Sequence, residues 1–209
     1  MPYSFTAELI KSGMTYTDYL ELFENLVARQ ATTGPDQSPA MVEYTKMNLT
    51  RSNRMNKVTM IPDSIKEFVQ SITTPLYFIL ITEPWCGDAA HSVPGIAALA
   101  KQNPLIDFRV FLRDEHPEVM NHYLTNGGKA IPILVVLRQD NLEELFHWGP
   151  RPIEAQEIVM SYKKKGDFKK EDMVNDVFKW YNQDKNLTLM DEIAASLKIT
   201  LSQHVPISK

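Results

Sequence analysis

The residue best placed to do chemistry in this sequence is Cys86, its one cysteine, which stands between Trp85 and Gly87. An apolar run ends just before it at Thr82, and helical spacing follows from Ala89, so the cysteine lies at a strand-to-helix turn. Free backbone N–H groups and the helix dipole at such a turn stabilise a thiolate, the reactive form of cysteine. We therefore expect Cys86 to be partly exposed and to act as a redox nucleophile. The alternative is an inert cysteine packed in the core.

Asp88 has two expected roles beside this thiol. Its side chain is suited to cap the first turn of the helix that follows, which would satisfy free amides there. Its negative charge would raise the pKa of Cys86 and so oppose the effect of the helix. The sequence alone leaves open whether the pKa of the thiol is raised or lowered overall.

The other residues that are able to do chemistry lack suitable partners. His91 lies on the same helix as Cys86, at a spacing that places it on another face, so we expect it on the polar surface of the helix. Residues 114–116, Asp-Glu-His, are expected in a solvated turn rather than at a cation. His122 and His147 have no partners at ligand spacing, so no metal and no cofactor are expected.

The hydrophobic pattern predicts the elements that position these residues. Strands are expected at 76–82, 106–112, 131–137 and 142–148, and helices at 89–101, 117–124 and 153–165. A helical crossover makes the first two strands parallel, and a hairpin turn at 139–141 makes the last two antiparallel. The fold class is therefore α/β, with a mixed four-stranded core sheet flanked by helices.

Helical patterns continue on both sides of this unit. Residues 14–57 carry apolar stripes around a loop at 32–36, and the face that holds Arg51 and Arg54 is expected to be solvated. Residues 168–199 give further helix. We expect an N-terminal helical extension at 1–60, a central domain at 61–166, and a C-terminal helical extension at 167–209 packed on that domain.

Several of these residues together resemble the thioredoxin superfamily. Trp85-Cys86-Gly87 matches the start of the active-site motif Trp-Cys-Gly-Pro-Cys, and Pro94 matches a helix-kinking proline. Residues 130–132, Ala-Ile-Pro, match the element before the third strand, and Gly149 matches a glycine after the fourth. The resemblance covers about residues 70–165 and looks like a divergent bacterial branch with a Trp-Cys-Gly-Asp motif and helical extensions.

The resemblance implies a thioredoxin-like fold in which the bond between Ile131 and Pro132 is cis and faces Cys86. It also implies that five residues shape a groove for the backbone of a partner: Trp85, Gly87, Asp88, Ile131 and Pro132. Because the charge of Asp88 works against a thiolate, the pKa of Cys86 should then fall less than in a dithiol thioredoxin, where it is about 7.

The departures from the family pattern change the chemistry that the resemblance implies. Ala89 stands where thioredoxins have the resolving cysteine, and Leu80 stands where they bury an aspartate. A disulfide within this chain is therefore impossible. One hypothesis is a monothiol redox protein: Cys86 attacks a disulfide of a protein or peptide, and an external thiol of the glutathione type resolves the product. The alternative is a non-catalytic protein- or peptide-binding module. Because Cys86, Trp85 and Pro132 are retained, we expect the first.

Composition narrows the partners and the compartment. The 209 residues carry a net charge of −4 and a pI of about 5.8, so no broadly basic face for nucleic acid is expected. The longest apolar run, residues 76–81, is far too short to span a membrane, and no secretory signal is visible. One cysteine suits a reducing compartment, so we expect a cytoplasmic protein with no membrane partner. The oligomeric state stays open.

Overall fold

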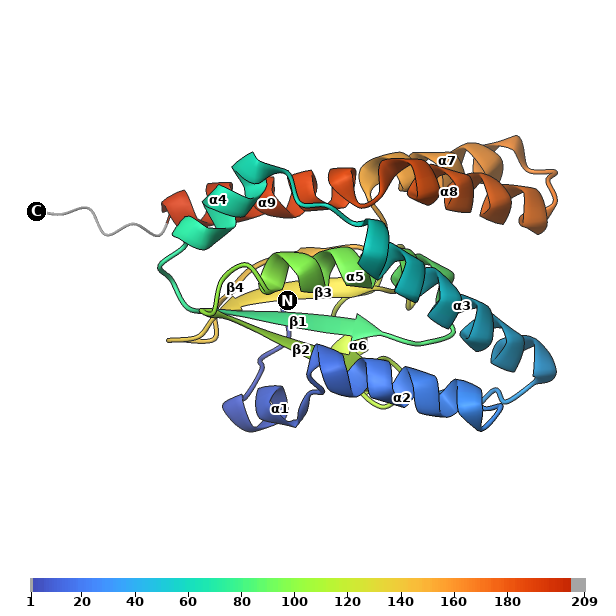
Figure 1. The fold of residues 1–209 in the computed structure, drawn as a ribbon, viewed down its shortest axis with the longest axis horizontal. Coiled ribbons are helices and arrows are strands. Elements are labelled where there is room, and N and C mark those ends of the chain that lie inside the picture. The colour runs from blue at the N-terminus through green and yellow to red at the C-terminus, as the bar shows by residue number, and fades with distance from the viewer. Residues whose placement is uncertain (1, 204–209) are drawn as a thin grey trace, which may run out of the picture.

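A four-stranded mixed sheet lies at the centre of the molecule (Figure 1), which a computed structural model describes for residues 2–203. The strands are β1 (Leu76–Thr82), β2 (Ile106–Leu112), β3 (Ile133–Arg138) and β4 (Glu144–Trp148). The order across the sheet is β2-β1-β3-β4. β1 and β2 are parallel, whereas β1 pairs with β3 and β3 with β4 in antiparallel fashion. These pairings confirm the predicted mixed sheet.

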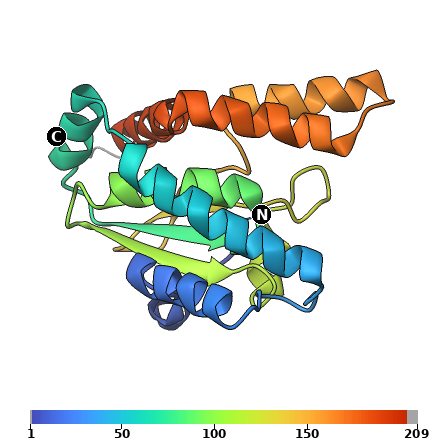
Figure 2. The ribbon, with the colours of Figure 1, turned by 45° about the vertical axis from the view of Figure 1, so that its right-hand side comes forward.

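Helices cover both faces of this sheet. In the described residues they are α1 (Ala7–Ser12), α2 (Tyr16–Ala28), α3 (Pro39–Val58), α4 (Asp63–Ser71), α5 (Gly87–Ala100), α6 (Pro117–Met120), α7 (Ile153–Lys165), α8 (Lys170–Asp184) and α9 (Leu187–Gln203). α5, α9 and the α7–α8 hairpin lie on one side of the sheet, and α1 and α2 lie on the other (Figures 1 and 2). No helix between residues 2 and 203 is both long and apolar enough to cross a membrane.

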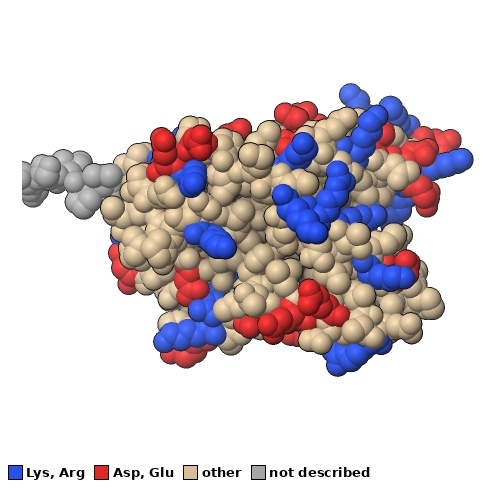
Figure 3. Space-filling view, in the orientation of Figure 1, with Lys and Arg blue, Asp and Glu red and all other residues tan. Residues whose placement is uncertain are grey.

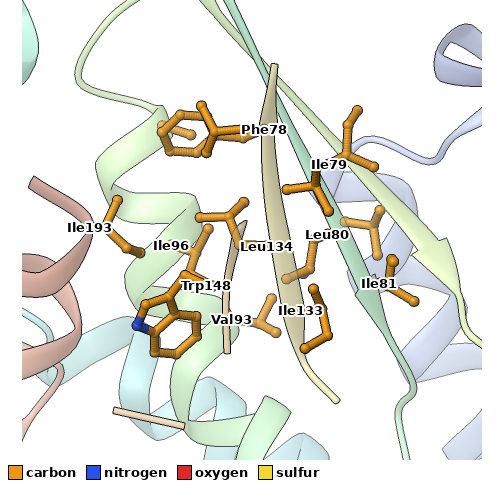
Figure 4. Close-up of a cluster of buried hydrophobic side chains, with 14 of the residues drawn as sticks. Phe78, Ile79, Leu80, Ile81, Val93, Ile96, Ile133, Leu134, Trp148 and Ile193 are labelled. Carbon is orange, nitrogen blue, oxygen red and sulfur yellow. The ribbon is translucent and has the colours of Figure 1, made fainter. Parts of the chain in front are cut away.

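β1 is buried along nearly its whole length because helices cover both faces of the sheet (Figure 1). Its side chains alternate, so Phe78 lies on the side of α5, near Ile96, and Ile79 and Ile81 lie on the opposite side (Figure 4). All four of these side chains are fully buried. Burial of each contributes about 1.5–3 kcal/mol. The continuous apolar run thus fixes the strand that ends just before the cysteine loop.

The structure differs from the sequence prediction at the ends of several elements. The helical pattern over 168–199 is broken at Lys185 and Asn186, which both have left-handed backbone conformations, with φ of 53° and 70°. This break separates α8 from α9. α6 is shorter than expected and ends at Met120, and β4 begins at Glu144 because Leu142 belongs to the hairpin turn, with φ of 60°.

The hairpin of α7 and α8 has a small hydrophobic core of its own. Ala155 and Val159 of α7 pack with Val177 and Tyr181 of α8, apart from the main core around the sheet. Tyr181 also reaches the N-terminal end of α5, so the hairpin contacts the segment that follows Cys86. The C-terminal helices therefore help to form the surroundings of the candidate site.

Candidate functional site

Cys86 is the N-cap residue of α5, and its side chain is buried rather than partly exposed. The residue is 8% exposed, and its thiol donates a hydrogen bond to the carbonyl oxygen of Ile131, with Sγ and O 3.3 Å apart. The expectation of a partly exposed cysteine is wrong. Sequence reasoning placed the residue correctly at the strand-to-helix turn, but not the parts of the chain that pack over that turn.

The start of α5 and the charge of Asp88 act on the thiol in opposite directions, as expected, and the net result is a raised pKa of Cys86. Burial and, after it, the charge of Asp88 raise the pKa of Cys86 to about 12. The backbone N–H groups of Ala89 and Asp88 and the charge of Arg151 act in the opposite direction. The thiol is therefore protonated at neutral pH in this conformation.

Asp88 forms an ion pair instead of capping the helix. It is the second residue of α5, and Cys86 takes the N-cap position. One Asp88 carboxylate oxygen, Oδ2, lies 2.5 Å from a guanidinium nitrogen of Arg151, and the other accepts a hydrogen bond of 3.2 Å from the hydroxyl of Tyr181. Burial raises the pKa of Asp88, while Arg151 opposes that shift. The expected capping role is wrong, because α5 begins at Gly87, two residues before the expected start at Ala89.

The segment Ile131-Pro132 lies against the cysteine, as expected. The bond between the two residues is cis, which confirms that prediction, and both residues are buried. Gly149 packs against this segment so closely that a Cβ atom there would lie 2.2 Å from the carbonyl oxygen of Pro132. The hydrogen-bonding edge of Ile131 is occupied by the thiol itself. A role for Ile131 and Pro132 in binding a partner therefore stays a prediction.

The loop before the cysteine is held by residues of the N-terminal helices. Glu83 is fully buried, and its carboxylate accepts hydrogen bonds from the hydroxyl of Thr33 and, at 2.9 Å, from the backbone N–H of Asp114. Burial raises the pKa of Glu83. Asn48 of α3 donates a hydrogen bond of 3.1 Å to the carbonyl of Pro84. The N-terminal segment therefore fixes the conformation of the Trp85-Cys86 turn.

A cavity of about 460 Å³ lies beside the motif, between α3 and α8. Trp85, Gly87 and Asp88 line it, whereas Cys86 does not. Of the five residues expected to form a binding groove, the structure thus brings these three to one cavity and buries Ile131 and Pro132 elsewhere.

Two further residues of the cavity wall were missed in the sequence. The ring of Phe178 lies over Gly87, where an added Cβ atom would come within 2.6 Å of it. The guanidinium of Arg51 lies 4.4 Å from the centre of the same ring. Arg51 was expected on a solvated face, which is wrong: it is half-buried, and burial lowers its pKa. No sequence motif links these two residues to the cysteine loop.

His91 is buried, so its expected position on a polar helix surface is also wrong. It is 2% exposed and stacks on Tyr181, with ring centres 4.8 Å apart and an angle of 4° between the rings. Neither ring nitrogen has a hydrogen-bond partner in the described residues. Burial, together with Arg51 and Arg54, lowers the pKa of His91 to about 3, so the ring is neutral.

The remaining candidates form no site of their own. Glu115 is exposed, and Asp114 pairs with Arg113 at 2.8 Å, as suits a turn. His147 pairs with Glu144 at 2.8 Å. Within residues 2–203 no group of three or more possible ligands is placed to hold a metal ion.

The parallel β1–β2 pair, the antiparallel hairpin and the cysteine at the start of α5 together define a thioredoxin-like α/β protein. A family model described as thioredoxin matches residues 34–165, so the chain belongs to this family. No curated protein matches the chain.

Two solved structures show the same fold over nearly the whole chain. One is the crystal structure of an HIV epitope scaffold, which is 16% identical, with a TM-score of 0.58, and the match covers 93% of this chain and 98% of that one. The other is a protein of unknown function from Pseudomonas aeruginosa, PA1234, which is 14% identical, with a TM-score of 0.56 and coverage of 94% and 98%. At these identities the likeness concerns the fold alone, and it includes the N- and C-terminal helices.

Proposed function

We propose that this protein is a thioredoxin-fold binding module, in which the motif around Cys86 forms the wall of a recognition cavity. The observation that carries this proposal is the state of the thiol. Cys86 is buried, donates a hydrogen bond to the carbonyl oxygen of Ile131 and has a pKa raised to about 12. Because a thiol must lose its proton to act as a nucleophile, this geometry supports recognition better than catalysis. The open surface of the motif is the cavity between α3 and α8.

Alkylation of Cys86 tests this function. Native protein and protein unfolded in guanidinium chloride are each treated with iodoacetamide at pH 8, and intact mass follows the modification. We expect the native protein to react at least about a hundredfold more slowly, because its thiolate is scarce. Comparable rates in the two states would show that Cys86 is an accessible nucleophile, which contradicts the proposal.

A second candidate is monothiol redox chemistry at Cys86, and one observation favours it. The backbone N–H groups of Asp88 and Ala89 and the charge of Arg151 all act to stabilise a thiolate at this sulfur. The Cys86 thiolate would attack a disulfide, form a mixed disulfide and release one thiolate. A glutathione-type thiolate would then attack the partner's sulfur in this mixed disulfide, form a new disulfide with it and release the Cys86 thiolate.

Turnover of hydroxyethyl disulfide with glutathione as the reductant tests this second function. Redox activity requires turnover above the uncatalysed rate that is lost in a Cys86→Ser variant. Equal rates for the two proteins would exclude the monothiol reaction and leave the binding function.

A further inference from the structure

We propose that the cavity between α3 and α8 binds a small organic anion that has an apolar body. This inference rests on the proposed binding function and names the class of ligand. It depends on the size of the cavity, the apolar side chains of its wall and the unpaired positive charge around it.

The size and wall of the cavity suit a small molecule. Its volume of about 460 Å³ falls within the range of about 300–1,000 Å³ for small-molecule sites. The apolar wall comes from both helices: Met41 and Tyr44 from α3, and Met173, Val174 and Phe178 from α8. Methionine side chains adapt to ligands of different shape. Tyr44 is 50% exposed, so an apolar ligand would cover a large side chain that now faces solvent.

The charges around the cavity favour an anion. Arg51, Arg151 and Lys170 line it, together with the acidic residues Asp88 and Glu171. Both carboxylate oxygens of Asp88 are already engaged, by Arg151 and by the Tyr181 hydroxyl. Figure 3 shows Lys and Arg side chains on both sides of the hollow between the α7–α8 hairpin and α3.

Two cations of the wall, Arg51 and Lys170, and one acid, Glu171, form no ion pair within the described residues, so the unpaired charges of the wall are positive on balance. Arg51 is held over the ring of Phe178 and donates to Asn48 at 2.7 Å, which leaves its positive charge unneutralised. A carboxylate or sulfonate would supply the missing negative charge beside Arg51 and Lys170.

A pair of matched fluorescent probes tests the inference. Anilinonaphthalene sulfonate carries an aromatic body and one negative charge, and phenylnaphthylamine has the same rings without the sulfonate. We expect saturable binding of the sulfonate with one site per chain, weaker binding of the amine, and a salt dependence only for the sulfonate. Decanoate should displace the sulfonate probe.

Charge-neutralising variants locate the site. Lys170 is exposed, so Lys170→Gln should leave the fold intact and weaken sulfonate binding about two- to fivefold without changing amine binding. Arg51→Gln should weaken sulfonate binding about fivefold or more, because this cation is half-buried. Lys46→Gln is the matched control, because Lys46 is an exposed lysine on α3, like Arg51, but does not line the cavity. Tyr44→Ala should weaken both probes.

Three outcomes would overturn the inference: no saturable binding, equal affinity for the two probes, or an equal loss in Lys46→Gln and Lys170→Gln. The proposed binding function is tested separately by the alkylation of Cys86. A reactive native thiol would defeat that function even if the sulfonate binds. An inert thiol with no sulfonate binding would leave the function and remove only this class of ligand.

Discussion

Replacing Asp88 with asparagine tests how the surroundings of Cys86 set its pKa. After burial, the Asp88 charge is the strongest influence that raises the pKa of the thiol. Asparagine keeps an oxygen that accepts from the Tyr181 hydroxyl but removes the charge. Arg151 would then act on the sulfur without a carboxylate to neutralise it. Both changes lower the pKa of Cys86.

The expected size of the effect follows from the ionised fraction of the thiol. At pH 8 a pKa of about 12 leaves roughly one thiol in ten thousand as thiolate, whereas the ordinary value of 9.0 leaves about one in ten. Loss of one neighbouring negative charge should lower the pKa by about one unit. The alkylation rate of native Asp88→Asn should therefore be about tenfold higher than that of the parent.

The assay measures iodoacetamide alkylation of folded protein by intact mass, at several values between pH 7 and 9. Parent and variant should give parallel plots of log rate against pH, with the variant displaced upward. Glu171→Gln is the control, because Glu171 also lines the cavity but has no resolved influence on the thiol. Thermal unfolding confirms that each variant is folded. Equal rates for Asp88→Asn and the parent would refute the reasoning about this charge.

Three other predictions concern stability. The folded pKa of Cys86 is raised from 9.0 to about 12, so the stability that the protonated thiol contributes is present below pH 9 and is lost as pH rises through this window. The parent should therefore lose about 1.4 kcal/mol more unfolding free energy than Cys86→Ser between pH 8 and 10. Identical pH profiles for the two proteins in urea titrations would contradict this. Gly149→Ala should lower the unfolding free energy by about 3 kcal/mol or more, because φ is +125° and the added Cβ meets the Pro132 carbonyl. The control Gly127→Ala, with φ of +77° and open space around it, should lower it by only about 1 kcal/mol. Equal losses in the two variants would show that the contact with Pro132 is unimportant. His91→Phe should raise the unfolding free energy by about 1 kcal/mol, since it removes two buried ring nitrogens that have no hydrogen-bond partner in the described residues. A clear decrease in unfolding free energy would mean that these nitrogens form hydrogen bonds in solution.

The sheet was predictable because its strands have continuous apolar runs. The run that ends at Thr82 matches β1 residue for residue, and the turn at residues 139–141 correctly marked the hairpin. The strand-to-helix position of Cys86 followed directly from these elements. Local pattern is sufficient where neighbouring residues decide the structure.

The environment of the cysteine was not predictable, because distant segments create it. Arg151 and Tyr181 are far from Asp88 in the sequence and reach it only once the α7–α8 hairpin has docked. His91 was misplaced for a related reason: α3 and α8 cover a second face of α5, so nearly every residue of this helix is buried. Spacing along a helix shows which residues share a face, but not how many faces are covered.

Incubation of the native protein with excess glutathione disulfide at neutral pH tests the central claim most directly, with intact mass as the readout. A buried, protonated Cys86 predicts that the mass of the folded protein is unchanged, and that the glutathione adduct forms only after unfolding. Rapid formation of the adduct in the folded state would contradict the account and identify Cys86 as a working redox nucleophile.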